Sequence, residues 1–316
     1  MSVTLALHDG RAGNARQALA LARALDAEAG ECSLLPRAPW RWLAPRALPA
    51  ADGAFGAGFD ALIARPPQLA IGCGRQAALA TRLLRTRGSQ AVQILDPRID
   101  PRHWDLVIAP QHDGLRGGNV IQMLGSLHPV DDLWLAQARR DAPHIAALPA
   151  PHTVLLVGAP SRHVAPCDAD FAALLRQLAQ RARDEGGSFS AIASRRTPQR
   201  WRDALAAIDA GVPGIRWRDE RDGANPYAGL LAHAQRIVCT PDSVNLLSEA
   251  CATRVPVGVL LGHRAQARML HFQRALRARG RLLDGLDALE AGPQQAIEPL
   301  RETPRIAAEV KARLGL

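Results

Sequence analysis

The stretch LPAPHTVLLVG, residues 148–158, decides how this chain is divided. Its first half is rich in proline, which interrupts regular structure. Its second half is an apolar run that ends in glycine, which is typical of a buried parallel strand. Strands and helices alternate before this stretch, and the alternation starts again with it. The sequence therefore predicts a boundary at residue 150, with an N-terminal domain over residues 1–150 and a C-terminal domain over residues 151–316.

Apolar segments of strand length alternate with segments of helical periodicity along the whole chain. The expected strands are residues 3–8, 31–35, 69–73, 91–95, 106–109, 119–123, 153–158, 188–193, 214–218, 236–240 and 256–261. The expected helices are residues 14–29, 74–87, 131–147, 168–185, 198–210, 243–254 and 266–279. Such alternation predicts parallel sheets with helices on both faces, and eleven strands exceed one comfortable sheet. The predicted fold class is α/β, with two Rossmann-like, doubly wound domains.

The last helix is signalled at its start and along one face. Thr303 is predicted to be its N-cap, and Pro304 suits the first turn. Ile306, Val310 and Leu314 mark an apolar face at helical spacing. This helix is assigned to the second domain, with packing back onto the first domain as the alternative.

Composition narrows the class of protein. No apolar run approaches the roughly 18–20 residues of a membrane-spanning helix. The N-terminus has no basic region or cleavage site of a signal peptide, so we expect a cytoplasmic protein. Its five cysteines form no C-x-x-C pair, which argues against a zinc site or a disulfide framework. We therefore expect no metal and no cofactor other than a nucleotide substrate.

The charge of the chain favours anionic partners. Arginine and lysine number 39 against 30 acids, for a net charge of +9, and Lys311 is the only lysine. Such a surface attracts phosphate-bearing ligands, anionic lipid or nucleic acid. Nucleic acid is the least favoured of these, because no helix-turn-helix or aromatic RNA-binding platform is recognisable.

Two loops in the first half follow expected strands at their carboxyl ends, where doubly wound sheets bind ligands. The first holds Asp9, Gly10, Arg11, Gly13 and Asn14, and a turn with an asparagine cap is its simplest alternative. The second, residues 71–77, has the G-x-G-x-x-A pattern around Gly74 and Arg75. Asp96 closes the next strand, as in dinucleotide folds. The pattern stands on the third strand, however, and Pro97 follows Asp96 directly. We therefore predict a substrate loop or plain strand–helix packing rather than NAD binding.

Two loops in the second half have phosphate-binding chemistry. Ser161 and Arg162 follow the first strand of the second domain, and Ser194 and Arg195 follow the next strand. Hydroxyl groups, backbone amides and a bidentate guanidinium together bind diphosphates well. Because the two loops follow consecutive strands, we predict one phosphate-binding rim.

A helix start in residues 240–250 points at the same rim. Asp242 ends a strand, Ser243 begins the helix, and Glu249 lies less than two turns further on. The backbone amides of a helix start bind anions, and Glu249 is placed to bind a ribose or sugar hydroxyl. The alternative is that Asp242 caps the helix and Glu249 is exposed.

Several enzyme classes are excluded by missing motifs. A Walker A loop needs a lysine, and the only one, Lys311, lies in the last helix. The Tyr-x-x-x-Lys pair of short-chain epimerases is absent, because Leu231 stands four positions after Tyr227. Asp168 and Asp170 match the D-x-D metal motif, but they open a helix, where acids act as caps.

Taken together, these loops resemble the mitochondrial fission ELM family, whose bacterial members are also called ELM/GtrOC-type glycosyltransferases. The resemblance covers about residues 5–262. It rests on residues 9–14 with Gln17, 71–75, 93–98, 109–113, 158–163, 194–197, 225–227, and 240–243 through 248–250. More distantly, the layout is similar to the lipid-linked N-acetylglucosaminyltransferase of peptidoglycan synthesis, although Asn14 replaces a histidine of that enzyme and cannot act as a base.

The resemblance implies a GT-B-like fold, with two domains facing a cleft. It implies sugar transfer from a nucleotide diphosphate sugar to a cell-envelope or lipid-linked acceptor. In this scheme the donor side comprises Ser161, Arg162, Ser194, Arg195, Asp242, Ser243 and Glu249. The acceptor side comprises Gly10, Arg11, Gly13, Asn14, Gly74 and Arg75, with Asp9 as general base. Plant members of the family promote mitochondrial division, so the alternative is a non-catalytic protein that recruits a dynamin-like GTPase.

One segment suggests a peripheral position at the inner face of a membrane. Residues 37–46 hold three arginines together with Trp40 and Trp42. Aromatic rings settle at the headgroup level, and arginine pairs with lipid phosphate. The alternative is that both tryptophans pack onto the first domain.

Overall fold

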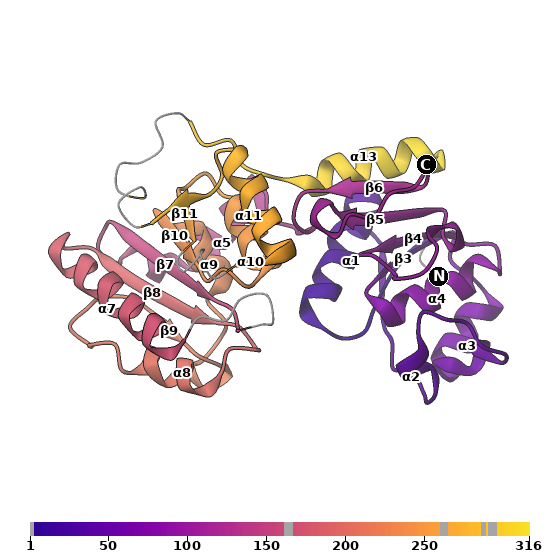
Figure 1. Ribbon diagram of the computed structural model, residues 1–316, viewed down its shortest axis with the longest axis horizontal. Coiled ribbons are helices and arrows are strands. Elements are labelled where there is room, and N and C mark those ends of the chain that lie inside the picture. Colours follow the sequence, from indigo (N-terminus) through magenta and orange to yellow (C-terminus); the bar gives the residue numbers. More distant parts are fainter. Residues whose placement is uncertain (1–2, 161–166, 260–264, 286–288, 290–295) are drawn as a thin grey trace. The chain divides into compact units, whose positions relative to one another are not determined.

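The computed structural model describes residues 3–160, 167–259, 265–285, 289 and 296–316. The chain forms two compact units (Figure 1): unit 1 is Met1–Pro129 with Arg301–Leu316, and unit 2 is Val130–Leu300. The division falls before the predicted residue 150, because helix α5 (Asp132–Asp141) belongs to unit 2. There it packs against α9 (Tyr227–His233), and Arg139 donates a hydrogen bond to the Ala232 carbonyl at 2.9 Å.

Unit 1 is built on a parallel sheet of six strands within the described residues, in the order β2-β1-β3-β4-β5-β6. The strands are β1 (Thr4–His8), β2 (Gly30–Ser33), β3 (Leu69–Cys73), β4 (Gln90–Ile94), β5 (Leu106–Pro110) and β6 (Val120–Met123). Its helices are α1 (Ala12–Leu25), α2 (Trp40–Leu43), α3 (Ala57–Ala64), α4 (Arg75–Arg85) and α13 (Glu302–Leu314), with 3-10 turns at Ala51–Ala54, Pro101–His103 and Gln111–Asp113.

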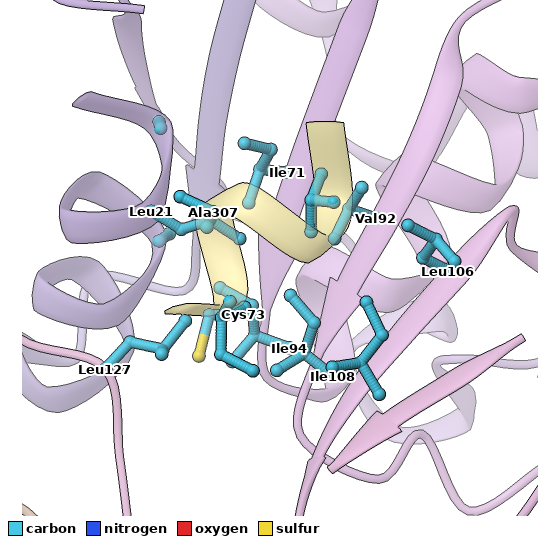
Figure 2. Close-up of a cluster of buried hydrophobic side chains, with 14 of the residues drawn as sticks. Leu21, Ile71, Cys73, Val92, Ile94, Leu106, Ile108, Leu127 and Ala307 are labelled. Carbon is cyan, nitrogen blue, oxygen red and sulfur yellow. The ribbon is translucent and has the colours of Figure 1, made fainter. Parts of the chain in front are cut away.

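The two faces of this sheet are buried by different helices. Helices α1 and α13 cover one face, where Leu21 and Ala307 pack on Ile71 and Val92 (Figure 2). Successive side chains of a strand point to opposite faces. Leu5 and the other alternate residues therefore meet α3 and α4 on the second face. Burial on both faces explains why β1, β3 and β5 read as continuous apolar runs, whereas the edge strand β2 does not.

Helix α13 joins unit 1 from the far end of the chain. It packs against α1 and β6 of unit 1. The alternative prediction, in which the last helix packs back onto the first domain, is therefore confirmed. Ile306 and Val310 are fully buried, as their spacing predicts. The N-cap prediction is wrong, because the helix begins at Glu302. The Thr303 hydroxyl instead donates to the His128 carbonyl at 2.8 Å and accepts from the His128 amide at 3.1 Å.

Unit 2 is built on a second parallel sheet of six strands in the part that the structure describes, in the order β12-β11-β10-β7-β8-β9. The strands are β7 (His152–Val157), β8 (Ser188–Ala193), β9 (Arg216–Trp217), β10 (Arg236–Cys239), β11 (Val257–Val259) and β12 (Leu283–Asp284). Besides α5 and α9, its helices are α6 (Pro143–Ala146), α7 (Asp168–Asp184), α8 (Gln199–Ala206), α10 (Val244–Cys251) and α11 (Ala267–Ala278), with a 3-10 turn at Glu220–Asp222.

The predicted α/β class with two Rossmann-like, doubly wound domains is confirmed by these sheets. Each expected strand has its counterpart, and β12 is an addition. The core of unit 2 includes the stacked rings of Phe171 and Trp201, whose centroids are 4.2 Å apart, packed with Leu155, Val157 and Phe189.

Candidate functional site

The strand order reverses beside the first strand of each unit. In unit 1 the reversal lies between β1 and β3, and in unit 2 it lies between β7 and β10. Doubly wound sheets bind ligands beyond the carboxyl ends of the strands at such points. Loops singled out from the sequence follow all four of these strands. Ser194 and Arg195 follow β8, the neighbour of β7.

Asp242 joins the two loops at the reversal point of unit 2. Its Oδ2 accepts a hydrogen bond from the Ala159 amide, after β7, at 2.6 Å. Its Oδ1 accepts from the Thr240 hydroxyl, after β10, at 2.7 Å. The Thr240 hydroxyl in turn accepts from the Gly158 amide at 2.8 Å. These contacts make the Asp242 carboxylate the clasp between the loops, and its binding of the nucleotide stays a prediction.

Burial raises the pKa of Asp242, and the hydrogen bonds from Thr240 and Ala159 oppose that rise. The positive charge of Arg196 opposes it further. Gly158 makes the clasp possible, because a Cβ atom there would lie 2.1 Å from Asp242 Oδ2. Any larger residue at this position would displace the carboxylate.

Thr197 ties the loop after β8 to the same place. Its hydroxyl donates to the Gly158 carbonyl at 2.7 Å and to the Val157 carbonyl at 3.0 Å. It also accepts from the Ser194 amide at 2.9 Å and lies 3.0 Å from the Ser194 hydroxyl. The joining of these two successive loops therefore depends on Thr197, which was not among the predicted site residues.

Arg195 is exposed and lines a cavity of about 270 Å³ beside this loop. The cavity is lined by Ser194, Arg195, Arg202, Trp217, Asp219, Glu220 and Arg221. Arg202 holds the loop in shape, because its guanidinium donates to the Ser194 carbonyl at 2.9 Å and to the Thr197 carbonyl at 3.0 Å. Ser161 and Arg162, predicted for the same rim, lie outside the described residues.

Helix α10 begins at the reversal point and carries the last two predicted donor residues. Ser243 is its N-cap, and the Ser243 Oγ atom accepts from the Leu246 amide at 3.3 Å. Glu249 is only 2% exposed, and its Oε2 accepts from the Tyr227 hydroxyl at 2.6 Å. The alternative prediction, that Asp242 caps the helix and Glu249 is exposed, is therefore wrong, because Ser243 is the cap and Glu249 is buried. Tyr227 was not assigned to the site from the sequence, although it lies in one of the stretches that carried the family resemblance.

In unit 1 the loop after β1 is organised around Asp9. Its Oδ1 accepts from the Asn14 side-chain amide at 2.9 Å and from the Arg11 backbone amide at 3.2 Å. Its Oδ2 lies 3.6 Å from Arg11 Nε, and its side chain is 8% exposed against 83% for Arg11. The Cys73 thiol at the end of β3 donates to Asn14 Oδ1 at 3.8 Å. Burial, and then the charge of Asp9, raise the pKa of that thiol well above its ordinary value.

Gly74 allows Asn14 to approach the end of β3. Its φ is +89°, and a Cβ atom would lie 2.4 Å from Asn14 Nδ2. The alternative prediction for this loop, a turn in which Asn14 caps the helix, is wrong, because α1 begins at Ala12 with Arg11 as its N-cap and Asn14 lies inside the helix. Gly72 is needed for strand–helix packing, since a Cβ atom there would lie 2.7 Å from Thr81 Cγ2. The G-x-G glycines thus have packing roles, and the absence of NAD binding stays a prediction.

The other predicted acceptor-side residues are Gly10, Gly13 and Arg75, and each has a different hydrogen-bond partner. Gly10 has a φ of +74°, and its amide donates to His8 Nδ1 at 3.1 Å. The Gly13 carbonyl accepts from the Gln17 side chain at 3.3 Å. Arg75 is exposed at the start of α4, where it donates to the Arg41 carbonyl at 3.3 Å.

The two tryptophans of α2 differ in exposure. Trp40 packs against the core cluster of Leu34 and Phe59, as the alternative for this segment predicts. Trp42 is 59% exposed, with the Arg41 guanidinium carbon 4.7 Å from its ring centroid. Only Trp42 is therefore available to a partner surface.

The predicted capping role of the D-x-D acids is confirmed for Asp170 but not for Asp168. Asp170 and Cys167 form a capping box at the start of α7, and Asp168 binds Arg200 and the Trp201 indole. Within the described ranges, no group of three or more His, Cys, Asp or Glu side chains is arranged to hold a metal ion. Nor does any helix there have the length and apolar character needed to cross a membrane.

Comparison with known proteins agrees with this architecture. The sequence model of the family described as "Mitochondrial fission ELM1" matches residues 12–314. Over 278 residues the chain is 29% identical to "Mitochondrial fission protein ELM1" of Arabidopsis thaliana. That alignment covers 79% of this chain and 64% of the plant protein, so the chain spans less than two thirds of its relative's length.

Solved structures of similar fold cover nearly the whole chain. The UDP-GlcNAc 2-epimerase of Methanocaldococcus jannaschii has a TM-score of 0.59 at 13% identity, over 99% of this chain and 100% of that one. The UDP-N-acetylglucosamine 2-epimerase of Rickettsia bellii has a TM-score of 0.56 at 13% identity, over 98% and 94%. The enzyme of Neisseria meningitidis, solved with UDP-GlcNAc bound, has a TM-score of 0.55 at 11% identity, over 98% and 99%. At such identities the likeness concerns the fold, which is of the GT-B type.

Proposed function

This chain belongs to the mitochondrial fission ELM1 family, and from that premise we propose that it is a metal-independent glycosyltransferase. It moves a sugar from a nucleotide diphosphate sugar to a cell-envelope or lipid-linked acceptor. The observation that carries the proposal is the joining of three loops at the reversal point of unit 2. Thr197 and Asp242 hold the ends of β7, β8 and β10 together, beside the start of α10.

Each donor residue has a role that its surroundings support. The diphosphate meets the exposed Arg195 guanidinium, Ser194 and the backbone amides that follow Ser243. Partial positive charge at a helix start and a guanidinium both stabilise a leaving diphosphate without a metal ion. Ser161 and Arg162 join them on the strength of the sequence alone. Glu249 accepts hydrogen bonds from the ribose.

Unit 1 supplies the acceptor side of the reaction. An acceptor hydroxyl oxygen forms a bond to the anomeric carbon of the sugar, and the bond from that carbon to the diphosphate oxygen breaks. The nucleoside diphosphate leaves with the electron pair of that bond, and Asp9 takes the hydroxyl proton. Asn14 and the Arg11 amide orient the Asp9 carboxylate for this task.

The first donor to test is UDP-N-acetylglucosamine. Two UDP-GlcNAc 2-epimerases of similar fold were solved with UDP-GlcNAc bound, one of them also with UDP.

A peripheral position on an anionic membrane accompanies the proposal. Leu35, Trp42 and Leu48 are 82%, 59% and 39% exposed within one short segment. Arg37, Arg41 and Arg46 are exposed beside them, and no acid lies between Glu31 and Asp52. Each basic residue near a charged bilayer adds about 1 kcal/mol of attraction. Such a surface gives reversible binding where a lipid-linked acceptor is held.

The second candidate function is an interaction role without catalysis. The curated plant relative is named as a fission protein, and this chain spans only 64% of it. In that case the chain keeps the GT-B fold and recruits a dynamin-like GTPase.

The two functions are separated by incubating the protein with UDP-, GDP-, ADP- and CMP-sugars and anionic membranes carrying lipid acceptors. Release of the nucleoside diphosphate and a labelled lipid product support transfer. Absence of both, together with no binding of any nucleotide sugar, supports the interaction role. An Asp9→Asn variant should bind donor normally and form no product if Asp9 is the base.

A further inference from the structure

The structure assigns a role to Tyr227, the only tyrosine of the chain. We propose that its hydroxyl holds the Glu249 carboxylate in the orientation that binds the ribose hydroxyls of the nucleotide. Tyr227 is then a positioning residue, and the inference rests on the proposed nucleotide site. It makes the preference for ribose over deoxyribose a property of the pair rather than of Glu249 alone.

The first step of the argument is the contact itself. Tyr227 is the first residue of α9, Glu249 lies in the second turn of α10, and their oxygens are 2.6 Å apart. A hydroxyl that donates to a carboxylate makes a short, charge-assisted bond of this length. An ionised carboxylate offers about four acceptor positions. The tyrosine hydroxyl occupies one of these positions and does not exhaust them.

The second step is that both ends of the contact are fixed. The Asn225 side chain accepts from the Tyr227 amide at 2.9 Å, which sets the start of α9. Gly229 of the same helix is closely packed, because a Cβ atom there would lie 2.5 Å from the Ala142 Cβ. Glu249 is 2% exposed, with Ala250 and Cys251 fully buried beside it.

The third step is that a buried glutamate needs a partner that holds its carboxylate in one rotamer. A long acidic side chain has several rotamers, and burial without partners is unfavourable for its charge. A phenol is neutral near pH 7, so it anchors the carboxylate without neutralising it. A carboxylate held in one rotamer accepts from a ribose hydroxyl at less entropic cost than a mobile one.

The test compares ribonucleoside and 2′-deoxyribonucleoside diphosphates by calorimetry, using UDP and dUDP, GDP and dGDP, and ADP and dADP. For the diphosphate that binds best, the wild type should prefer the ribose form by about tenfold, the factor that corresponds to about 1.4 kcal/mol. Tyr227→Phe should lower this preference to twofold or less, while affinity for the deoxy form changes little. Glu249→Gln should do the same, and the double variant should show no further loss.

The matched control is Thr253→Val. It removes a buried hydrogen bond to the Ala250 carbonyl, 2.7 Å long, near the end of the same helix. It should lower stability and leave the ribose preference unchanged. If Tyr227→Phe does not fold, Glu249→Gln carries the test, and an unchanged preference in it overturns the inference.

The failures are distinguishable. A wild type that binds none of the diphosphates contradicts the proposed function itself. If the wild type and Tyr227→Phe bind a diphosphate and prefer its ribose form to the same degree, only the positioning role of Tyr227 is contradicted.

Discussion

The Asp242 carboxylate accepts a hydrogen bond from the Ala159 amide at 2.6 Å across 83 positions of sequence. This contact closes the reversal point between β7 and β10, and Gly158 leaves room for it. The nucleotide site proposed for unit 2 depends on it, because it fixes the loop after β7 against the start of α10.

Replacing Gly158 should therefore damage both stability and binding. In Gly158→Ala the new methyl group meets Asp242 and breaks its bonds to Ala159 and Thr240. Leaving buried donors unsatisfied costs about 1–3 kcal/mol. Chemical denaturation should show this loss, and nucleoside diphosphate affinity should fall as well. Gly58→Ala is the control, since nothing lies within 4 Å of its added Cβ atom. Equal stability of the two variants would contradict the clasp.

Gly74 is predicted to matter for the acceptor side rather than for the donor side. In Gly74→Ala, backbone strain should cost about 1–3 kcal/mol, and the methyl group should push Asn14 away from Asp9. Misplacement of a catalytic group lowers turnover by roughly tenfold to a hundredfold. Gly88→Ala has the same positive-φ strain with nothing within 4 Å of its Cβ atom. It should lose stability but keep turnover, and a similar turnover loss in both variants would rule out the Asn14 contact as the cause.

The stability of unit 2 should depend on pH through His152. Burial lowers the pKa of His152 to about 4, while its imidazole contacts the Ser190 hydroxyl at 2.8 Å. The unfolded chain binds the proton below a pKa of about 6.5, but the folded chain does not. The free energy of unfolding should therefore fall as pH drops from about 6.5 to about 4, by at most about 3 kcal/mol from this group. Denaturation across this range should give a shallower slope for His152→Gln. Identical slopes would exclude His152.

The two tryptophans of α2 should respond differently to substitution. Trp42→Ala should keep the stability of the protein and lose binding to anionic vesicles, because its ring is exposed. Trp40→Ala should cost about 2 kcal/mol of stability, because this ring packs against the core. Vesicle sedimentation should require anionic lipid and weaken with salt. Wild-type protein that ignores anionic vesicles at low salt would make the segment purely structural.

Much of this architecture could be predicted because local sequence patterns determine where its longer strands and helices lie. Strands such as Leu69–Cys73 are continuous apolar runs, and helices such as α7 have a capped start and a regular apolar face. Short elements gave no such signal: α2 has four residues and β12 has two. The boundary at residue 150 followed the prolines, although α5 before them belongs to unit 2 through contacts with α9 that no local pattern reveals.

The site residues divide in the same way. Loops at strand ends could be located, because the carboxyl ends of parallel strands share one edge of a sheet. Their internal bonding could not, because it depends on which side chains meet across long separations. Asp242 and Thr197 proved to be ties between loops, and Tyr227 meets Glu249 from another helix. Thr303 has the right residue type for a helix cap, but its hydroxyl binds the backbone of His128 instead.

The most direct test of the central claim is titration calorimetry with UDP, GDP and ADP on the wild type, Arg195→Ala and Ser243→Ala. If the diphosphate sits at the joined loops of unit 2, the wild type binds at least one of the three. Arg195→Ala should then weaken that binding by about 1–3 kcal/mol, the range for a lost charge-assisted hydrogen bond. Ser243→Ala should weaken it as well, because it removes the N-cap that holds the start of α10 in place. Binding with the same affinity in all three proteins, or no binding by the wild type, would contradict the account.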